Sequence, residues 1–143
     1  IALDIYGNKL KELKRRAKRD GAHNVETRAI DSTKVIKKLY DTADRVLIDA
    51  PCTGLGVLKR NPDAKWKLQP DFLEKIMVTQ QQILQDYSRI VKPGGKLVYA
   101  TCSKKFLGSE AGKDFSLIKD SNIYACKTGF DGFYMALLEK KST

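Results

Sequence analysis

Short apolar runs along this chain predict strands that alternate with helices. The runs that predict buried strands cover residues 1–5, 25–30, 45–50 and 96–101. The run at 45–50 is continuously apolar before Asp49, which is typical of a parallel strand covered on both faces. Residues 115–119 and 133–139 predict two further strands that pair as an antiparallel hairpin near the end of the chain.

Between the strands, apolar residues recur at helical spacing. Helices are expected over residues 8–19, 32–40 and 71–91. The first should direct Leu10, Leu13 and Ala17 inward. The apolar stripe of the long third helix contains one polar member, Gln80. The sequence Pro93-Gly94-Gly95 is expected to end that helix, since neither proline nor glycine continues a helix well.

The alternation of strands and helices predicts an α/β fold with right-handed crossovers and a parallel sheet. Ligands of such sheets bind beyond the carboxyl ends of the strands. Five chemically reactive side chains are expected at those ends: Asp4, Asp31, Asp49, Cys52 and Cys102. They should therefore lie along one edge of the sheet, next to a loop predicted for residues 51–69.

The composition indicates a globular domain with no predicted membrane span. The chain has 143 residues, 42% of them hydrophobic and 31% charged, which suits a globular domain. No apolar run is long enough to predict a membrane span. Lys and Arg outnumber Asp and Glu by 27 to 17, and the resulting charge of +10 favours a polyanionic partner such as nucleic acid. Three cysteines without C-x-x-C spacing argue against a disulfide framework and suggest the reducing cytoplasm.

The residue types at the strand ends leave alternatives open. Asp4 could hold the ribose of a nucleotide or cap the end of its strand, and Asp31 could bind a nucleoside or cap the next helix. Cys52 alone could be a structural thiol in a tight turn fixed by Pro51. Together with Cys102 it suggests covalent catalysis, redox chemistry or a metal site. A single, distant histidine argues against metal.

Five motifs resemble those of the Sun/Fmu family of RNA cytosine-5 methyltransferases, in the family's order and over nearly the whole chain. They are Asp49-Ala-Pro-Cys-Thr-Gly54, Lys59-Arg-Asn-Pro-Asp-Ala-Lys-Trp66, Lys92-Pro-Gly-Gly-Lys96, Ala100-Thr-Cys-Ser103 and Gly129-Phe-Asp-Gly-Phe133. The resemblance implies a Rossmann-like class I methyltransferase sheet, mostly parallel with a C-terminal antiparallel hairpin. It also implies S-adenosylmethionine as cofactor and RNA as substrate, with ribosomal RNA favoured over transfer RNA.

The resemblance further implies a role for each candidate residue. Cys102 would attack C6 of the target cytosine, and Cys52 would assist loss of the C5 proton and release of the enzyme. Asp4 would hold the ribose of the cofactor, and Asp31 would lie near its adenine. Asp49 would face both the methionine end of the cofactor and the target base. DNA cytosine methyltransferases use the Pro-Cys thiol as nucleophile instead.

The loop after Cys52 is the expected contact surface for RNA. Pro51, Lys59, Arg60 and Lys65 would hold the flipped nucleotide and its phosphates. Trp66 is expected to anchor this loop in the core, and stacking on a base is the alternative.

The family's glycine-rich cofactor loop and the strand before it are not within residues 1–143 and are expected just upstream of Ile1, and relatives carry a longer segment after Ser103. We therefore expect residues 1–143 to be part of a methyltransferase domain that folds poorly and binds cofactor weakly alone. Two other functions stay open: a transfer RNA enzyme of this family and an inactive RNA-binding fragment. Pro51-Cys52 together with Thr101-Cys102 argues against a methyltransferase of amines.

Overall fold

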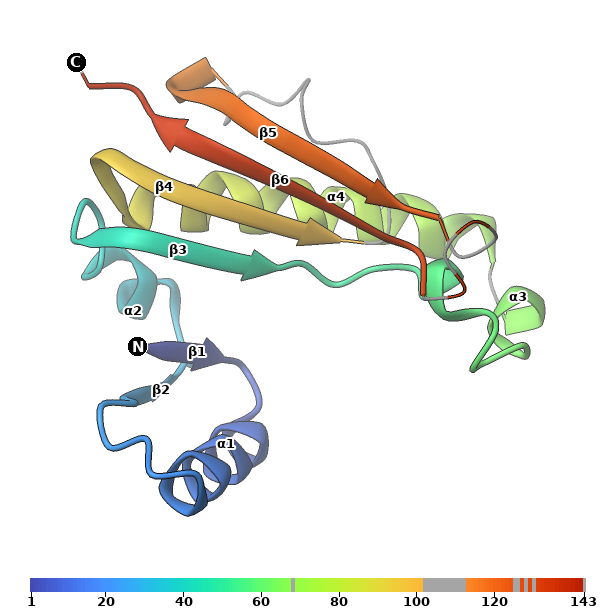
Figure 1. The fold of residues 1–143 in the computed structure, drawn as a ribbon, viewed down its shortest axis with the longest axis horizontal. Helices are drawn as coiled ribbons and strands as arrows, with labels where there is room; N and C mark the ends of the chain where they lie inside the picture. Colours follow the sequence, from blue (N-terminus) through green and yellow to red (C-terminus); the bar gives the residue numbers. More distant parts are fainter. Residues whose placement is uncertain (68, 102–112, 125–126, 128, 130, 143) are drawn as a thin grey trace. The chain divides into compact units, whose positions relative to one another are not determined.

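The computed structural model describes residues 1–67, 69–101, 113–124, 127, 129 and 131–142 of the chain (Figure 1). Its internal contacts divide the chain into two compact units, Ile1–Leu39 and Tyr40–Thr143. The larger unit contains the strand ends expected to carry Asp49, Cys52 and Cys102, whereas Asp4 and Asp31 belong to the smaller one. Within the described part of the chain, no helix is both long enough and apolar enough to cross a bilayer.

The N-terminal unit is a parallel pair of short strands with two helices. Its elements are β1 (Ala2–Asp4), α1 (Gly7–Arg19), β2 (Thr27–Ala29) and α2 (Thr33–Lys37). Helix α1 packs on both strands, with Leu10 buried, while its lysines and arginines are exposed. The basic run of α1 is therefore a solvated face, and Leu13, which was expected to point inward, is exposed.

The C-terminal unit holds a four-stranded sheet in the order β3-β4-β6-β5. Its strands are β3 (Ala43–Asp49), β4 (Val91–Thr101), β5 (Phe115–Ile123) and β6 (Phe133–Lys140). Its helical segments are the 3₁₀ turns η1 (Leu55–Val57) and η2 (Ser88–Ile90), the short α3 (Ala64–Lys67) and the long α4 (Pro70–Tyr87). β3 and β4 pair in parallel, and β6 pairs antiparallel with both β4 and β5.

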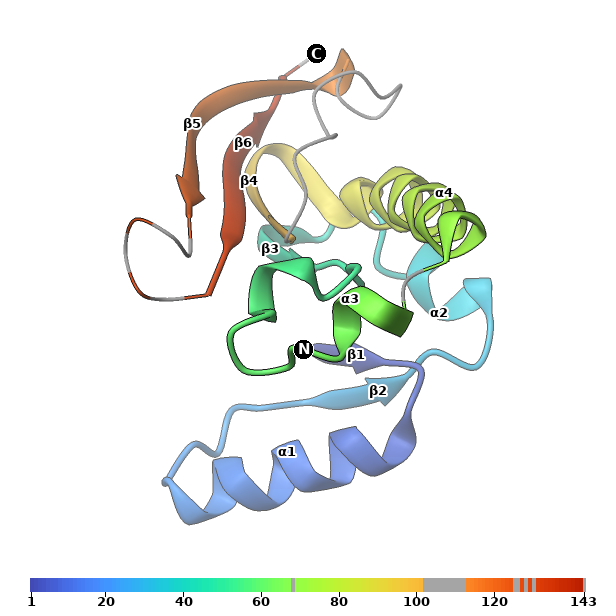
Figure 2. The ribbon, with the colours of Figure 1, turned by 90° about the vertical axis from the view of Figure 1, so that its right-hand side faces the viewer.

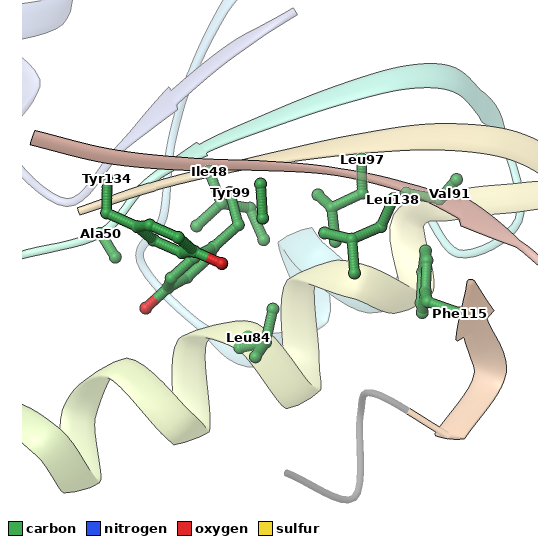
Figure 3. Packing of buried hydrophobic residues seen from close by; sticks show 10 residues of the cluster. Ile48, Ala50, Leu84, Val91, Leu97, Tyr99, Phe115, Tyr134 and Leu138 are labelled. Carbon is green, nitrogen blue, oxygen red and sulfur yellow. The ribbon is translucent and has the colours of Figure 1, made fainter. Parts of the chain in front are cut away.

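The core of this unit lies between the sheet and α4, which runs along one face of the sheet (Figures 1 and 2). Because strand side chains alternate, every second residue of β3, β4 and β6 faces the helix. Figure 3 shows these side chains, from Ala50 and Tyr134 to Leu97 and Leu138, directed toward α4, from which Leu84 joins the cluster. Removal of this apolar surface from water is the main force that holds α4 in place.

The predicted α/β class is confirmed, with parallel strand pairs followed by an antiparallel C-terminal hairpin. The insertion of β6 between β4 and β5 brings the connection between β5 and β6 to the same end of the sheet as the carboxyl ends of β3 and β4. This placement matters for the candidate site.

The predicted helix over residues 71–91 extends too far at its C-terminus. α4 stops at Tyr87, a 3₁₀ turn follows, and the strand begins already at Val91 instead of residue 96. Val91 is fully buried and pairs with Ala43, so burial within the sheet outweighs the helical spacing of the sequence here.

The predicted burial of residues 45–50 on both faces is wrong for one face, where Arg45, Leu47 and Asp49 are exposed. Leu47 is 69% exposed, because α4 covers only the opposite face of β3, where Ile48 and Ala50 are buried. The predicted helix at residues 32–40 is also shorter, since α2 ends at Lys37.

Gly95 offers a test of this packing at the start of β4. A Cβ atom there would lie 2.8 Å from Val91 Cγ1, 2.9 Å from the carbonyl oxygen of Lys92 and 3.1 Å from that of Ala43. Two of these neighbours are backbone and cannot rotate away. We expect Gly95→Ala to lower the free energy of unfolding of the full-length protein by about 2 kcal/mol, measured by urea titration.

Gly7→Ala is the matched control, because nothing lies within 4 Å of the added methyl group and Gly7 opens a helix. The control should leave stability unchanged or raise it slightly. Equal stability of the two variants would contradict the close packing at Gly95.

Candidate active site

Asp4 lies at the carboxyl end of β1, with a half-buried side chain. Its Oδ1 accepts a hydrogen bond of 2.8 Å from the backbone amide of Tyr6, and its Oδ2 lies 3.9 Å from Lys9 Nζ. The carboxylate therefore shapes the turn into α1, as the structural interpretation of Asp4 expected. Oδ2 has only a distant cation and can still accept a hydroxyl group.

Asp31 follows the neighbouring strand at the same end of this small sheet. The amide of Ile30 donates to the carbonyl oxygen of Asp4 at 3.0 Å, which extends the parallel pairing to the residue before Asp31. Asp31 is exposed, and its Oδ1 accepts a hydrogen bond of 3.1 Å from the Ser32 hydroxyl. Two carboxylates thus stand at the carboxyl ends of adjacent parallel strands, the side of an α/β sheet where ligands bind.

Asp49 is the last residue of β3 in the C-terminal unit. It is exposed and pairs in register with Ala100 of β4. Its neighbours Ile48 and Ala50 are buried against the helical face, so alternation directs the Asp49 carboxylate to the other side of the sheet.

Cys52 lies directly beyond this strand end. The amide of Ala50 donates to the carbonyl oxygen of Ala100 at 3.0 Å and forms the last backbone link described between the two strands. Pro51 and Cys52 then leave the sheet. Cys52 is a free cysteine, and the residue is half-buried.

The second strand end is described as far as Thr101. This residue is 1% exposed and lies opposite Tyr134 of β6. Cys102 comes next and lies outside the described residues, so its sulfur and its distance from Cys52 stay predictions. The structure brings together the strand ends that lead into the two thiol motifs, and it separately brings Asp4 beside Asp31.

Gln80 of α4 links these two strand ends and was missed as a site residue in the sequence. Its Nε2 donates to the carbonyl oxygen of Pro51 at 2.7 Å and to Thr101 Oγ1 at 2.9 Å. The one signal in the sequence was its place as the only polar residue in an apolar stripe.

Tyr134 of β6 lies opposite Thr101 and was also not singled out in the sequence. Its ring is buried and its hydroxyl donates to Asp120 Oδ2 at 3.3 Å. Burial raises the pKa of Tyr134, and the nearby negative charge of Asp120 raises it further. The phenol therefore stays neutral at physiological pH and acts as a packing and hydrogen-bonding group behind Thr101.

The loop after Cys52 is held by its backbone. Gly54 adopts a positive φ of 77°, which turns the chain into η1. The amide of Gly132 donates to the carbonyl oxygen of Gly56 at 2.7 Å, and a Cβ atom on Gly132 would come within 3.2 Å of Gly56 Cα. Two glycines thus allow the loop to dock closely on the connection between β5 and β6.

Two expected RNA contacts strengthen this docking. Arg60 forms an ion pair with Asp131, and Lys59 Nζ donates to the carbonyl oxygen of Gly129 at 3.2 Å. Their side chains therefore have partners within the protein. The Arg60 side chain remains 72% exposed, so the ion pair leaves it at the surface.

The prediction that Trp66 anchors the loop in the core is wrong, because Trp66 is 77% exposed. The contacts of Gly56, Lys59 and Arg60 fix the loop instead, and the short α3 leaves the indole at the surface. Lys65 Nζ lies 4.7 Å from the centre of the Trp66 ring. This exposed pair of a cation and an aromatic ring suits a phosphate and a base.

Among the described residues, no three His, Cys, Asp or Glu side chains lie close enough to hold a metal ion. Within the C-terminal unit, the described groups with chemical capacity are the Cys52 thiol, the Asp49 carboxylate and the basic loop that follows Cys52.

Comparison with known proteins relates this chain to RNA methyltransferases. The chain is 32% identical to Ribosomal RNA small subunit methyltransferase B of Pasteurella multocida over 98% of its length, which is 36% of that protein. It is 38% identical to the protein of the same name from Vibrio cholerae, over 68% of this chain and 26% of that protein. The chain thus spans about a third or less of the relatives it matches.

A solved structure agrees with this relationship. The crystal structure of NSun6 from Pyrococcus horikoshii with SFG aligns with 99% of this chain and 41% of that one, with a TM-score of 0.81 and 26% identity. The family model described as 16S rRNA methyltransferase RsmB/F matches residues 1–133. The chain therefore belongs to the RsmB/F family of 16S rRNA methyltransferases.

Proposed function

We propose that the full-length protein transfers a methyl group from S-adenosylmethionine to C5 of a cytosine in RNA through a covalent adduct with Cys102. The observation that carries this proposal is the position of Cys52, a half-buried thiol directly beyond the end of β3. It lies beside the strand whose end leads into Cys102. Family membership supports methylation of RNA.

The two thiols divide one difficult reaction into easier steps. The Cys102 thiolate adds to C6 of cytosine, and the electron pair released from the ring makes C5 nucleophilic. The bound cofactor supplies an electrophilic methyl group on its sulfonium. Cys52 then removes the proton from C5, the electron pair of the broken C–H bond restores the ring double bond, and the bond between C6 and the Cys102 sulfur breaks. Cys102 is then a thiolate again, whereas Cys52 carries the proton taken from C5 and must pass it to solvent before the next turnover.

The proposal assigns three carboxylates to the cofactor. Asp4 and Asp31 stand at the carboxyl ends of adjacent parallel strands, where the ribose hydroxyls and adenine of a nucleoside are held in related folds. Asp49 stands at the end of β3 and would serve the methionine end or the target base. The structure of NSun6 with SFG, an analogue of S-adenosylmethionine, supports this cofactor.

The proposed substrate is ribosomal RNA. The names of the family and of its relatives favour it over transfer RNA, and the charge of +10 suits a polyanion. The target base must leave its stack to reach the thiols. Lys65 and Trp66 are free to contact the RNA, whereas Lys59 and Arg60 would combine a phosphate contact with their role in holding the loop.

Substitution of each thiol tests the chemistry in the full-length protein. We expect Cys102→Ala to lower methyl transfer to rRNA by roughly 10³-fold or more, because no adduct can form. Cys52→Ala should instead accumulate a protein–RNA adduct, because loss of the C5 proton and release become slow. Labelled methyl transfer measures the first effect, and a slower band on a denaturing gel reveals the second.

Cys126→Ala is the matched control, since it removes a third thiol that belongs to neither motif and should leave turnover unchanged. Methylation by Cys102→Ala, or the absence of an adduct with an inactive Cys52→Ala, would refute the assigned thiol roles. Binding of rRNA without any methyl transfer by the natural protein would favour the inactive RNA-binding alternative.

Substitution of the exposed residues Lys65 and Trp66 of α3 tests whether this loop binds RNA. Lys65→Ala should weaken rRNA binding, and the slope of log affinity against log salt should fall by about 0.7 because one phosphate contact is lost. Trp66→Ala should weaken binding with an unchanged slope, because stacking does not release counterions. Lys119→Ala, on the edge strand β5, is the charge-matched control. A slope unchanged by Lys65→Ala would exclude the phosphate contact.

A further inference from the structure

We propose that Gln80 is a positioning residue that sets the distance and orientation between the two thiol-bearing strand ends. The inference rests on the proposed function of Cys52 and Cys102. Gln80 carries no reactive group and acts through the hydrogen bonds of its side-chain amide.

Gln80 is buried, with only 7% of its surface exposed, and it extends from α4 toward the ends of β3 and β4. Its Nε2 donates to the carbonyl oxygen of Pro51 at 2.7 Å and to Thr101 Oγ1 at 2.9 Å. An amide nitrogen has two protons, so these two bonds use its full donor capacity. A carbonyl oxygen can only accept, so the nitrogen of Gln80 must be the atom that faces Pro51.

Each acceptor belongs to the residue immediately before a thiol. The carbonyl of Pro51 is part of the peptide group that joins Pro51 to Cys52, and this group is planar. A hydrogen bond to its oxygen therefore restrains the orientation of the whole peptide group, which includes the backbone nitrogen of Cys52. The bond to Thr101 Oγ1 fixes the side chain of a β-branched residue, and with it the backbone that leads into Cys102.

Backbone pairing between β3 and β4 does not reach Pro51, and Thr101, the last residue of β4, is paired with Tyr134 of β6 on its other side. Backbone pairing of β3 with β4 reaches the bond from Ala50 to Ala100, the last one described, and Pro51 has no amide proton with which to continue it. Gln80 supplies a contact beyond that point, from a third element. Leu84 fixes α4 to the core. The Gln80 amide therefore holds both strand ends at a set position relative to this helix.

An apolar residue would be the ordinary occupant of this position. Gln80 lies on the same helix face as Ile83, Leu84 and Tyr87, which pack on the core. Burial of an amide is unfavourable unless its hydrogen bonds are made, and a satisfied buried polar group specifies one geometry more sharply than apolar packing does. A requirement of the reaction for one fixed spacing of the two strand ends would explain why a glutamine occupies this buried position.

The test compares Gln80→Leu with the natural full-length enzyme. Leucine fills much of the volume but donates no hydrogen bond, so the strand ends can shift relative to each other. A displacement of about 1 Å between reacting groups costs roughly 10²-fold in rate, so we expect kcat to fall by about that factor. The KM for rRNA and cofactor affinity should stay within about twofold, because Gln80 is buried beneath the site.

The adduct provides a second readout. In the Cys52→Ala background, Gln80→Leu should slow adduct formation by a similar factor, measured in a single turnover on a denaturing gel. Gln81→Leu is the matched control, since the same substitution on the adjacent, exposed residue leaves both strand ends untouched. Thermal unfolding of each variant shows whether the fold is kept.

Thr101→Val removes one of the two acceptors with almost no change of shape. We expect it to lower kcat by roughly tenfold. The double variant with Gln80→Leu should be no slower than Gln80→Leu alone, because the second substitution removes a bond that is already lost. A merely structural role for Gln80 would lower stability and give additive losses, with no selective effect on the chemical step.

The outcomes separate this inference from the proposed function. If the natural enzyme forms the adduct through Cys102 and Gln80→Leu matches the Gln81→Leu control, the positioning role is overturned while the mechanism stands. If Cys102→Ala still methylates, the mechanism itself fails. Loss of kcat only in proportion to loss of folded protein, in both Gln80→Leu and Thr101→Val, would likewise overturn the positioning role.

Discussion

The packing of α4 on one face of the four-stranded sheet is the constraint on which the rest of the C-terminal unit depends. Leu84 from the helix and Leu97 and Leu138 from the strands are almost completely buried in one cluster. Since a helix is rigid over its length, this burial also decides where its remaining side chains point. One of them, Gln80, reaches the ends of β3 and β4, so the force that forms the core also positions the candidate site.

The antiparallel hairpin adds a second constraint from the other side. With β6 beside β4, the connection between β5 and β6 lies at the end of the sheet where Cys52 leaves β3. Gly132 and Asp131 from this connection contact Gly56 and Arg60 of the loop after Cys52. The motif near the end of the chain thus contacts and supports the loop that follows the Cys52 motif.

The sequence predicted where strands end more accurately than it predicted which residues are buried. Placement of Asp49 and Cys52 at the end of a strand was confirmed, because a short apolar run that ends in polar residues is a local signal. The predicted core role of Trp66 and burial of Leu47 were wrong, because burial depends on what other segments cover. The roles of the individual candidate residues, and the position of Cys102, remain predictions.

The sequence by itself determined the α/β class, the order of the strands along the chain and the residues that follow each strand, since these depend on local periodicity and on turn residues. Only the tertiary structure decided which of those segments meet. The link from Gln80 to Pro51 and Thr101 joins residues 29 and 21 positions apart, and the ion pair from Arg60 to Asp131 spans 71. No local pattern encodes such contacts, because they arise only when burial of the apolar core has brought distant segments to the same end of the sheet.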